Sequence, residues 1–149
     1  MSQKSVVIVN KKASFEYHLL QSYTAGIMLT GTEVKSIREG KASLSEAFCI
    51  LTNSELWVKN LHISEFKQGS YNNHEPKRLR KLLLNKAELR KIDSKLKEKG
   101  TTLIPVKLYF NERGFAKLEI SLARGKKTFD KREDLKKKDQ EREIRRVVR

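Results

Sequence analysis

Lysine and arginine are the residues of this sequence that are best placed to do chemistry together. The 149-residue chain holds 33 of them against 18 Asp and Glu, a formal net charge of +15. Two groups stand near the ends of expected elements, where long side chains can reach phosphate oxygens. They are Lys35, Arg38 and Lys41, and then Lys77, Arg78, Arg80 and Lys81. This charge favours a nucleic acid as partner, and an anionic membrane surface is the weaker alternative.

A third basic segment covers residues 124–149. It holds twelve Lys and Arg and six Asp and Glu, a net charge of +6, and too few apolar residues to bury a face. Asp130 and Glu133 have capping-box spacing, and Glu133 and Lys137 can pair along a helix. Such a segment cannot offset its own ordering entropy. We expect a tail that is disordered when free and helical on a polyanion; a solvated helix docked on its own domain is the alternative.

Residue types that serve catalysis or metal binding are not arranged for either role. His18, His62 and His74 have no second His or Cys at ligand spacing, and the single cysteine, Cys49, excludes a disulfide framework. The sequence has no glycine-rich phosphate loop and no nucleophile elbow. Acid pairs could be assembled into a nuclease site, but nothing in the sequence supports one. We expect no enzyme, no catalytic residue, no metal and no cofactor.

The cellular setting follows from the same composition. The apolar run at residues 6–9 is too short for a signal peptide, and no stretch approaches the length of a transmembrane segment. One cysteine fits a reducing compartment. We therefore expect a cytoplasmic monomer without a membrane partner.

Short strands are the main elements that must position these groups. Alternating or β-branched runs predict strands at residues 6–9, 17–30, 45–51, 56–61, 102–110 and 115–123, with further extended chain from His62. We expect Gly26 to mark a bulge, and Pro105 to mark a bulge or an edge. Residues 67–76 read as a surface loop. In the fifth strand one face is expected to hold Ile104, Val106, Leu108 and Phe110.

Two helices are expected between the strands. Thr32 is expected to cap a helix of about two turns that Gly40 ends. Asn85, with Glu88 three residues later, caps a longer helix that ends at Gly100. The buried stripe of the longer helix is Leu89, Ile92 and Leu96. On this basis Asn85 is most simply a cap and Leu83 most simply a core residue.

Five or six short strands, with a full helix before the last two, match a small closed barrel of the OB type. An SH3-like barrel is the competing architecture. We expect the barrel to cover residues 1–123 and the basic tail to cover residues 124–149. Phe129, the one aromatic residue of the tail, can either stack on an exposed base or anchor the root of the tail on the barrel.

Five sequence blocks, in this order, resemble the family of bacterial SsrA-binding proteins. The blocks are NKKASFEY (residues 10–17), AGIMLTGTEVKSIREGKASL (25–44), NHEPKRLRKLLLNKAEL (73–89), GTTLIPVKLYF (100–110) and LARGKKTFDKREDLKKKD (122–139). The resemblance implies an OB-fold barrel that binds transfer-messenger RNA and enters ribosomes stalled on an mRNA without a stop codon. The barrel would hold the RNA elbow, and the tail would become helical in the decoding centre and empty mRNA channel. The stalled chain is then tagged, and the protein itself catalyses nothing.

The resemblance also assigns roles to single residues. Leu83 and Asn85 lie where the family contacts the RNA elbow, with Lys81 as a phosphate partner beside them. Thr24 stands where some members have an RNA-contacting glutamate, and its hydroxyl can still bond to RNA. Stacking on ribosomal RNA becomes the favoured role of Phe129. The complete RNA-binding set is Thr24, Gly26, Lys35, Arg38, Lys41, Arg78, Arg80, Lys81, Leu83 and Asn85. The ribosome-binding set is Lys126, Lys127, Phe129, Asp130, Lys131, Arg132, Lys136, Lys137 and Lys138.

Overall fold

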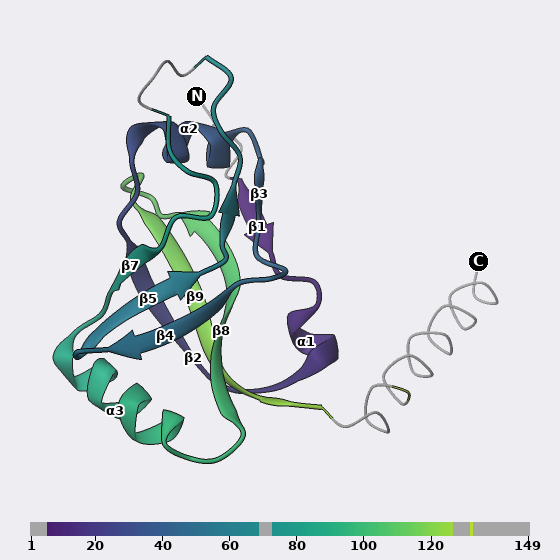
Figure 1. The fold of residues 1–149 in the computed structure, drawn as a ribbon, viewed down its shortest axis with the longest axis vertical. Coiled ribbons are helices and arrows are strands. Elements are labelled where there is room, and N and C mark those ends of the chain that lie inside the picture. Colours follow the sequence, from purple (N-terminus) through teal and green to yellow (C-terminus); the bar gives the residue numbers. More distant parts are fainter. Residues whose placement is uncertain (1–5, 69–72, 127–131, 133–149) are drawn as a thin grey trace.

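Strands make up most of the regular structure in the computed structural model, which describes residues 6–68, 73–126 and 132 (Figure 1). The strands are β1 (Val7–Val9), β2 (Tyr17–Ile27), β3 (Ala42–Ser43), β4 (Phe48–Thr52), β5 (Glu55–Lys59), β6 (His62–Ile63), β7 (Arg80–Leu83), β8 (Thr101–Phe110) and β9 (Ala116–Gly125). The helices are α1 (Ala13–Glu16), α2 (Gly31–Arg38) and α3 (Lys86–Leu96). The strand predictions were therefore largely correct, but β7 was not predicted.

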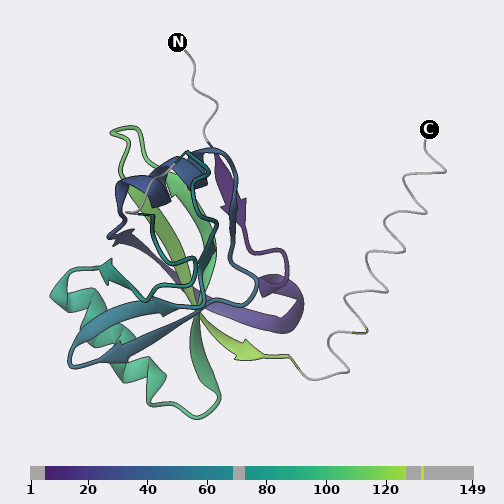
Figure 2. The same ribbon diagram turned by 45° about the horizontal axis from the view of Figure 1, so that its top comes forward.

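Seven strands form one antiparallel sheet in the order β1-β8-β9-β2-β7-β5-β4, and β3 pairs with β6 in a second small sheet. Within the described residues β1 and β4 are the two edges, so strand pairing does not close the barrel that we predicted. The reason lies at these edges. β1 is three residues long and lies beside β3, while β4 crosses near β8 without a hydrogen-bonded ladder. The sheet instead curls so that β4 and β5 cover β8 and β9 (Figures 1 and 2).

The bulges decide which side chains enter the core. β2 is irregular between Leu19 and Gln21, whereas Gly26 stays in register with both neighbouring strands, so the predicted bulge at Gly26 was wrong. The bulge predicted at Pro105 is confirmed by the register shift between β8 and β9. Since this bulge reverses the alternation, Leu108 joins the main core while Ile104 packs in a second small cluster. The predicted single apolar face of β8 was therefore wrong.

Both long helices begin with side-chain caps. Thr30, not the predicted Thr32, caps α2, because Glu33 stands at its N3 position and completes a capping box. The oxygen Oδ1 of Asn85 accepts the backbone N–H of Glu88 at 2.8 Å, which confirms the predicted cap of α3. Ile92 is fully buried in the main core, with Leu89 and Leu96 packed against it from the same helix, as predicted. In the described part of the chain, no helix is long and apolar enough to cross a membrane.

The two long helices lie at opposite ends of the curled sheet. α2 covers one end, and α3 lies beside the β4–β5 hairpin at the other end (Figures 1 and 2). The β4–β5 turn is tight because Asn53 and Ser54 both have positive φ, the conformation that two-residue hairpin turns require. The fold thus presents two separate helix-bearing surfaces.

Candidate nucleic-acid interface

The outer face of β2 and β7 carries an unusual exposed leucine. In β2, Tyr23, Ala25 and Ile27 point into the core, so Thr24 and Gly26 belong to the outer face. Gly26 pairs with Leu83 of β7, whose side chain is 51% exposed. Leu83 is therefore not the core residue that its apolar character suggested. The structure places Thr24, Gly26 and Leu83 on one face, where an apolar side chain is available to a ligand.

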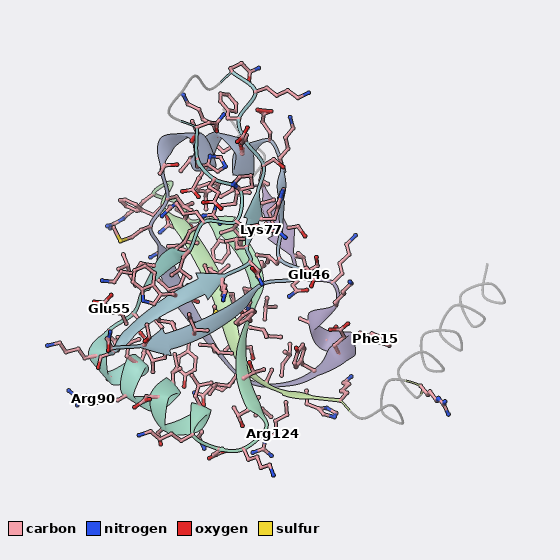
Figure 3. All side chains as sticks on the ribbon, viewed as in Figure 1. Phe15, Glu46, Glu55, Lys77, Arg90 and Arg124 are labelled. Atoms are coloured by element: carbon pink, nitrogen blue, oxygen red, sulfur yellow. The ribbon has the colours of Figure 1, made fainter. Side chains whose placement is uncertain are left out.

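A cleft of about 640 Å³ continues from this face toward α3. Both apolar and charged residues line it. Its lining includes Leu51, Leu83, Leu84 and Leu89 together with Lys81, Lys86, Arg90, Glu55 and Asp93. Figure 3 labels Glu55, at the start of β5, and Arg90, on α3, which both line this cleft. Apolar side chains can pack on the face of a base, and cations can bind phosphates. Such a cleft suits a nucleotide whose base has left its stack.

The charges at the rim of the cleft are held on short, regular elements. Lys81 follows Arg80 on β7 and lies 3.5 Å from the Glu55 carboxylate, in a partly exposed pair. Such a pair contributes little to stability, so Lys81 can exchange Glu55 for a phosphate at small cost. Asn85 uses its side-chain oxygen to cap α3, so a contact with RNA would use its amide nitrogen. Lys81 and Leu83 thus line the cleft, and Asn85 follows them at the start of α3.

The basic group on α2 lies elsewhere. Its three cations are exposed, and each has a neighbour within the protein. The ammonium of Lys35 lies 5.6 Å from the Phe66 ring centre, and the guanidinium of Arg38 lies 4.3 Å from the Phe110 ring centre. Lys41 pairs with Glu39 at 3.4 Å. Because α2 and α3 occupy opposite ends of the sheet, the structure does not bring this group to the Leu83 cleft (Figure 1).

Arg80 is the clearest departure from the predicted RNA-binding set. Its side chain is 0% exposed, and its Nε donates to Oε2 of Glu33. Its Nη1 donates to the Leu61 carbonyl at 2.6 Å, and its Nη2 donates to the Pro76 carbonyl at 3.1 Å. A guanidinium buried among these acceptors has no surface to offer a phosphate. The prediction that Arg80 contacts RNA is therefore corrected: its donors serve the protein interior.

Arg78 shares the same carboxylate from the partly exposed side. Its Nη2 lies 2.6 Å from Oε1 of Glu33. Burial by itself raises the pKa of Glu33, but hydrogen bonds from Arg78, the Thr30 backbone and Arg80, with the charge of Arg80, outweigh it and lower the pKa. Glu33 is therefore a buried, ionised acceptor. We call Glu33, Arg78 and Arg80 the buried clamp.

Sequence reasoning missed Glu33 and His74. Glu33 could have been found, because Thr30 and Glu33 have capping-box spacing. His74 lies in a segment that reads as a surface loop, yet it is buried. Its Nε2 donates to the Ile63 carbonyl at 2.9 Å, and its Nδ1 lies 2.9 Å from the Thr32 hydroxyl. His74 thus joins that loop to β6 and α2 rather than serving as a ligand.

The tail predictions concern mostly residues outside the described part of the chain. Lys126 is described: its backbone N–H donates to the Glu16 carbonyl at 2.8 Å, which fixes the root of the tail against α1. Arg132 is described and exposed. The predicted tail residues that lie outside the described ranges are Lys127, Phe129, Asp130, Lys131, Lys136, Lys137 and Lys138. Glu133, the predicted partner of Asp130 and Lys137, also lies outside them.

Reactive groups other than cations have ordinary structural surroundings in the described residues. No group of three or more His, Cys, Asp or Glu there could hold a metal ion. Cys49 is fully buried, and this burial raises the pKa of its thiol, so the reactive thiolate is disfavoured. The arrangement as a whole is suited to binding.

Comparisons with known proteins show the family of this chain. A family model described as SmpB protein matches residues 7–149. An SsrA-binding protein of Bacteroides thetaiotaomicron is 58% identical over 147 residues, which cover 99% of this chain and 98% of that protein. An SsrA-binding protein of Cytophaga hutchinsonii is 58% identical over 144 residues, which cover 97% of this chain and 94% of that protein.

A solved structure extends the likeness to three dimensions. It is described as "tmRNA-SmpB: a journey to the center of the bacterial ribosome", and its matching chain is 50% identical, with a TM-score of 0.71. The match covers 83% of this chain and 86% of that chain. The sequence matches over nearly the whole length and the fold over 83% of it, and the chain belongs to the SmpB protein family.

Proposed function

We propose that this chain binds transfer-messenger RNA, the SsrA RNA, and delivers it to stalled ribosomes for trans-translation. The observation that carries this function is the 58% identity to an SsrA-binding protein across 99% of the chain. The protein acts by binding and not by catalysis. It substitutes for the anticodon arm that the tRNA-like part of this RNA lacks, and the ribosome then tags the incomplete chain.

The RNA elbow binds to the face formed by Thr24, Gly26, Lys81, Leu83 and Asn85. Exposed Leu83 meets an unstacked base or a ribose, because removing this apolar side chain from water is favourable. Lys81 leaves Glu55 for a phosphate, and the Asn85 amide nitrogen donates to the RNA. Gly26 allows the RNA to approach Leu83 closely, since it adds no side chain beside it.

The α2 group makes a second RNA contact. Lys35, Arg38 and Lys41 are exposed at the far end of the sheet, too far round the molecule to share one small elbow contact with Leu83 (Figure 1). Cations held over aromatic rings keep their charge while their direction is restricted. This group therefore steers a phosphate backbone that passes over α2.

The architecture behind these surfaces is an OB-type barrel with its seam between β1 and β4, formed by residues 1–123. Residues 124–149 form the tail, which is helical in the decoding centre and empty mRNA channel. Lys126, Lys127, Lys131, Arg132 and Lys136 to Lys138 would meet rRNA phosphates there, while Asp130 caps the helix and Phe129 stacks on a base. The protein works as a cytoplasmic monomer on the RNA and the ribosome.

A competition experiment tests this function. Labelled transfer-messenger RNA bound to the full chain is displaced by unlabelled transfer-messenger RNA, ordinary tRNA or an unstructured RNA at one salt concentration. The proposal requires transfer-messenger RNA to compete best. Equal competition by the unstructured RNA would indicate a general single-stranded RNA binder. Salt dependence alone cannot decide, because every such binder neutralises phosphates.

A further inference from the structure

We propose that Glu33 and Arg80 are positioning residues for RNA recognition, and that the buried clamp holds β7 so that Lys81 and Leu83 face the RNA together. This inference rests on the proposed function and deepens it. It also gives a role to charged residues that the binding surface leaves unused, because Glu33 and Arg80 are both 0% exposed.

The clamp joins three segments that are distant in sequence. Glu33, in the first turn of α2, accepts from Arg80 of β7 and from Arg78 before it. Its Oε1 also accepts the Thr30 backbone N–H at 2.8 Å, which fixes the start of α2. Arg80 then donates to the carbonyl of Leu61, just before β6, and to the carbonyl of Pro76, before β7. The Glu33–Arg80 pair therefore sets α2, these two points of the chain and β7 relative to one another.

The position of Arg80 is transmitted directly to the RNA-facing side chains. Because side chains alternate along a strand, Arg80 and Leu82 point inward, while Lys81 and Leu83 point outward. β7 has four residues, of which two pair with β2 and three pair with β5. These short ladders set the neighbours of β7, and the directional bonds of Arg80 add a side-chain anchor to them.

An ion pair serves this purpose better than apolar packing. Apolar contacts of similar volume often stabilise as well as a buried pair, but they tolerate small shifts and rotations. The guanidinium of Arg80 must instead meet Glu33, Leu61 and Pro76 at fixed angles. A small slip of β7 would break these bonds, so the clamp admits one placement of Leu83.

The decisive measurement is a double-mutant cycle on the affinity of the full chain for the tRNA-like part of transfer-messenger RNA. Glu33→Gln keeps the shape of the side chain and removes its charge. We expect it to weaken binding roughly tenfold in the wild-type background. In a background that already carries Lys81→Ala and Leu83→Ala, we expect a loss of less than about twofold, because there is nothing left to position. An equal loss in both backgrounds, or none in either, overturns the proposal.

Two controls separate positioning from charge and from stability. Glu46→Gln removes an exposed carboxylate before β4 and makes the same change of net charge, and it should leave the affinity unchanged. Leu103→Ala lowers stability through the core from β8, a strand that does not pair with β7, and it should not lower the affinity at a temperature where the variant is folded. If either control weakens binding as much as Glu33→Gln does, the clamp has no specific role.

Arg78→Gln keeps the proposal testable if Glu33→Gln does not fold. Arg78 is partly exposed, so its loss removes one donor to Glu33 and leaves Arg80 in place. As part of the clamp it should be non-additive with the change at Lys81 and Leu83, and the salt dependence of binding should keep its slope. A direct phosphate contact would instead be additive and would reduce the slope by about 0.7–0.9; that result overturns the assignment. Failure of the proposed function shows separately, as a wild-type chain that does not prefer transfer-messenger RNA.

Discussion

Gly26 and Leu83 face each other across the β2–β7 pair, and a Cβ added at Gly26 would lie 3.4 Å from the Leu83 Cβ. An alanine therefore fits at Gly26 in ordinary contact, while a larger side chain would cover Leu83. At this pair the proposed RNA surface has room for only a small side chain beside Leu83, and the first prediction follows from it.

Gly26→Ala should leave stability unchanged or raise it by about 0.5 kcal/mol, because alanine loses less backbone entropy on folding. Gly26→Leu should also fold, but it should weaken RNA binding by roughly tenfold, because the added side chain covers the apolar surface of Leu83. Thermal unfolding and RNA titration of the two variants check this. Equal affinity of both variants would place the RNA away from Leu83.

Asn85 combines a cap and a proposed RNA contact, and two substitutions separate these roles. Asn85→Ala should lower the free energy of unfolding by about 1 kcal/mol and also weaken RNA binding. Asn85→Asp should keep the cap, because the carboxylate still accepts the Glu88 N–H, but it should lose the RNA contact. Chemical denaturation and RNA titration distinguish them. An Asp variant with normal affinity would make Asn85 a cap only.

The pH dependence of stability should reveal the buried clamp. Since the pKa of Glu33 is lowered from 4.5, the folded protein binds this proton less readily than the unfolded chain does. The clamp's contribution is therefore complete above that value and is lost as the pH falls through the lowered pKa. At pH 7, Glu33→Gln should lower the free energy of unfolding by about 3 kcal/mol.

The measurement is chemical denaturation of the wild-type and Glu33→Gln proteins between neutral pH and about pH 3. The difference in the free energy of unfolding should stay constant down to pH 4.5 and then shrink. A difference that does not change with pH would mean that Glu33 acts through its shape and not its charge.

Deleting residues 130–149 should separate the two halves of the function. The described body keeps its ladders and the Lys126 contact with Glu16, so binding of transfer-messenger RNA should be nearly intact. Tagging of stalled chains in a reconstituted translation system should be abolished. Loss of most of the RNA affinity in this variant would show that the tail, and not the sheet, holds the RNA.

The helices and the last hairpin could be predicted from sequence because their signals are local. Asn85 and Glu88 stand three residues apart, and the alternation of β9 puts Leu118, Ile120 and Leu122 in the core as expected. The cap of α2 also has a local signal, because Glu33 stands three residues after Thr30. The predicted cap, Thr32, lacks such a partner at that spacing, and the prediction was wrong.

β7 and the clamp could not be predicted because their partners are distant. β7 is a strand because it pairs with β2 and β5, which begin far earlier in the chain. An arginine is ordinarily exposed, and Arg80 is buried only because Glu33, 47 residues away, compensates its charge. The open edges of the sheet likewise depend on contacts between β1, β3, β4 and β8 that no local pattern encodes.

The Lys126 contact with Glu16 has a mechanical consequence. β9 is paired on both sides, with β2 and β8, over most of its ten residues, and the tail leaves from its end. Hydrogen bonds of antiparallel strands run perpendicular to the strands, so a pull along the tail loads both ladders in shear. Shear stretches many bonds at once, whereas unzipping would break them singly. The paired strands therefore resist a force that is applied along β9 at Lys126.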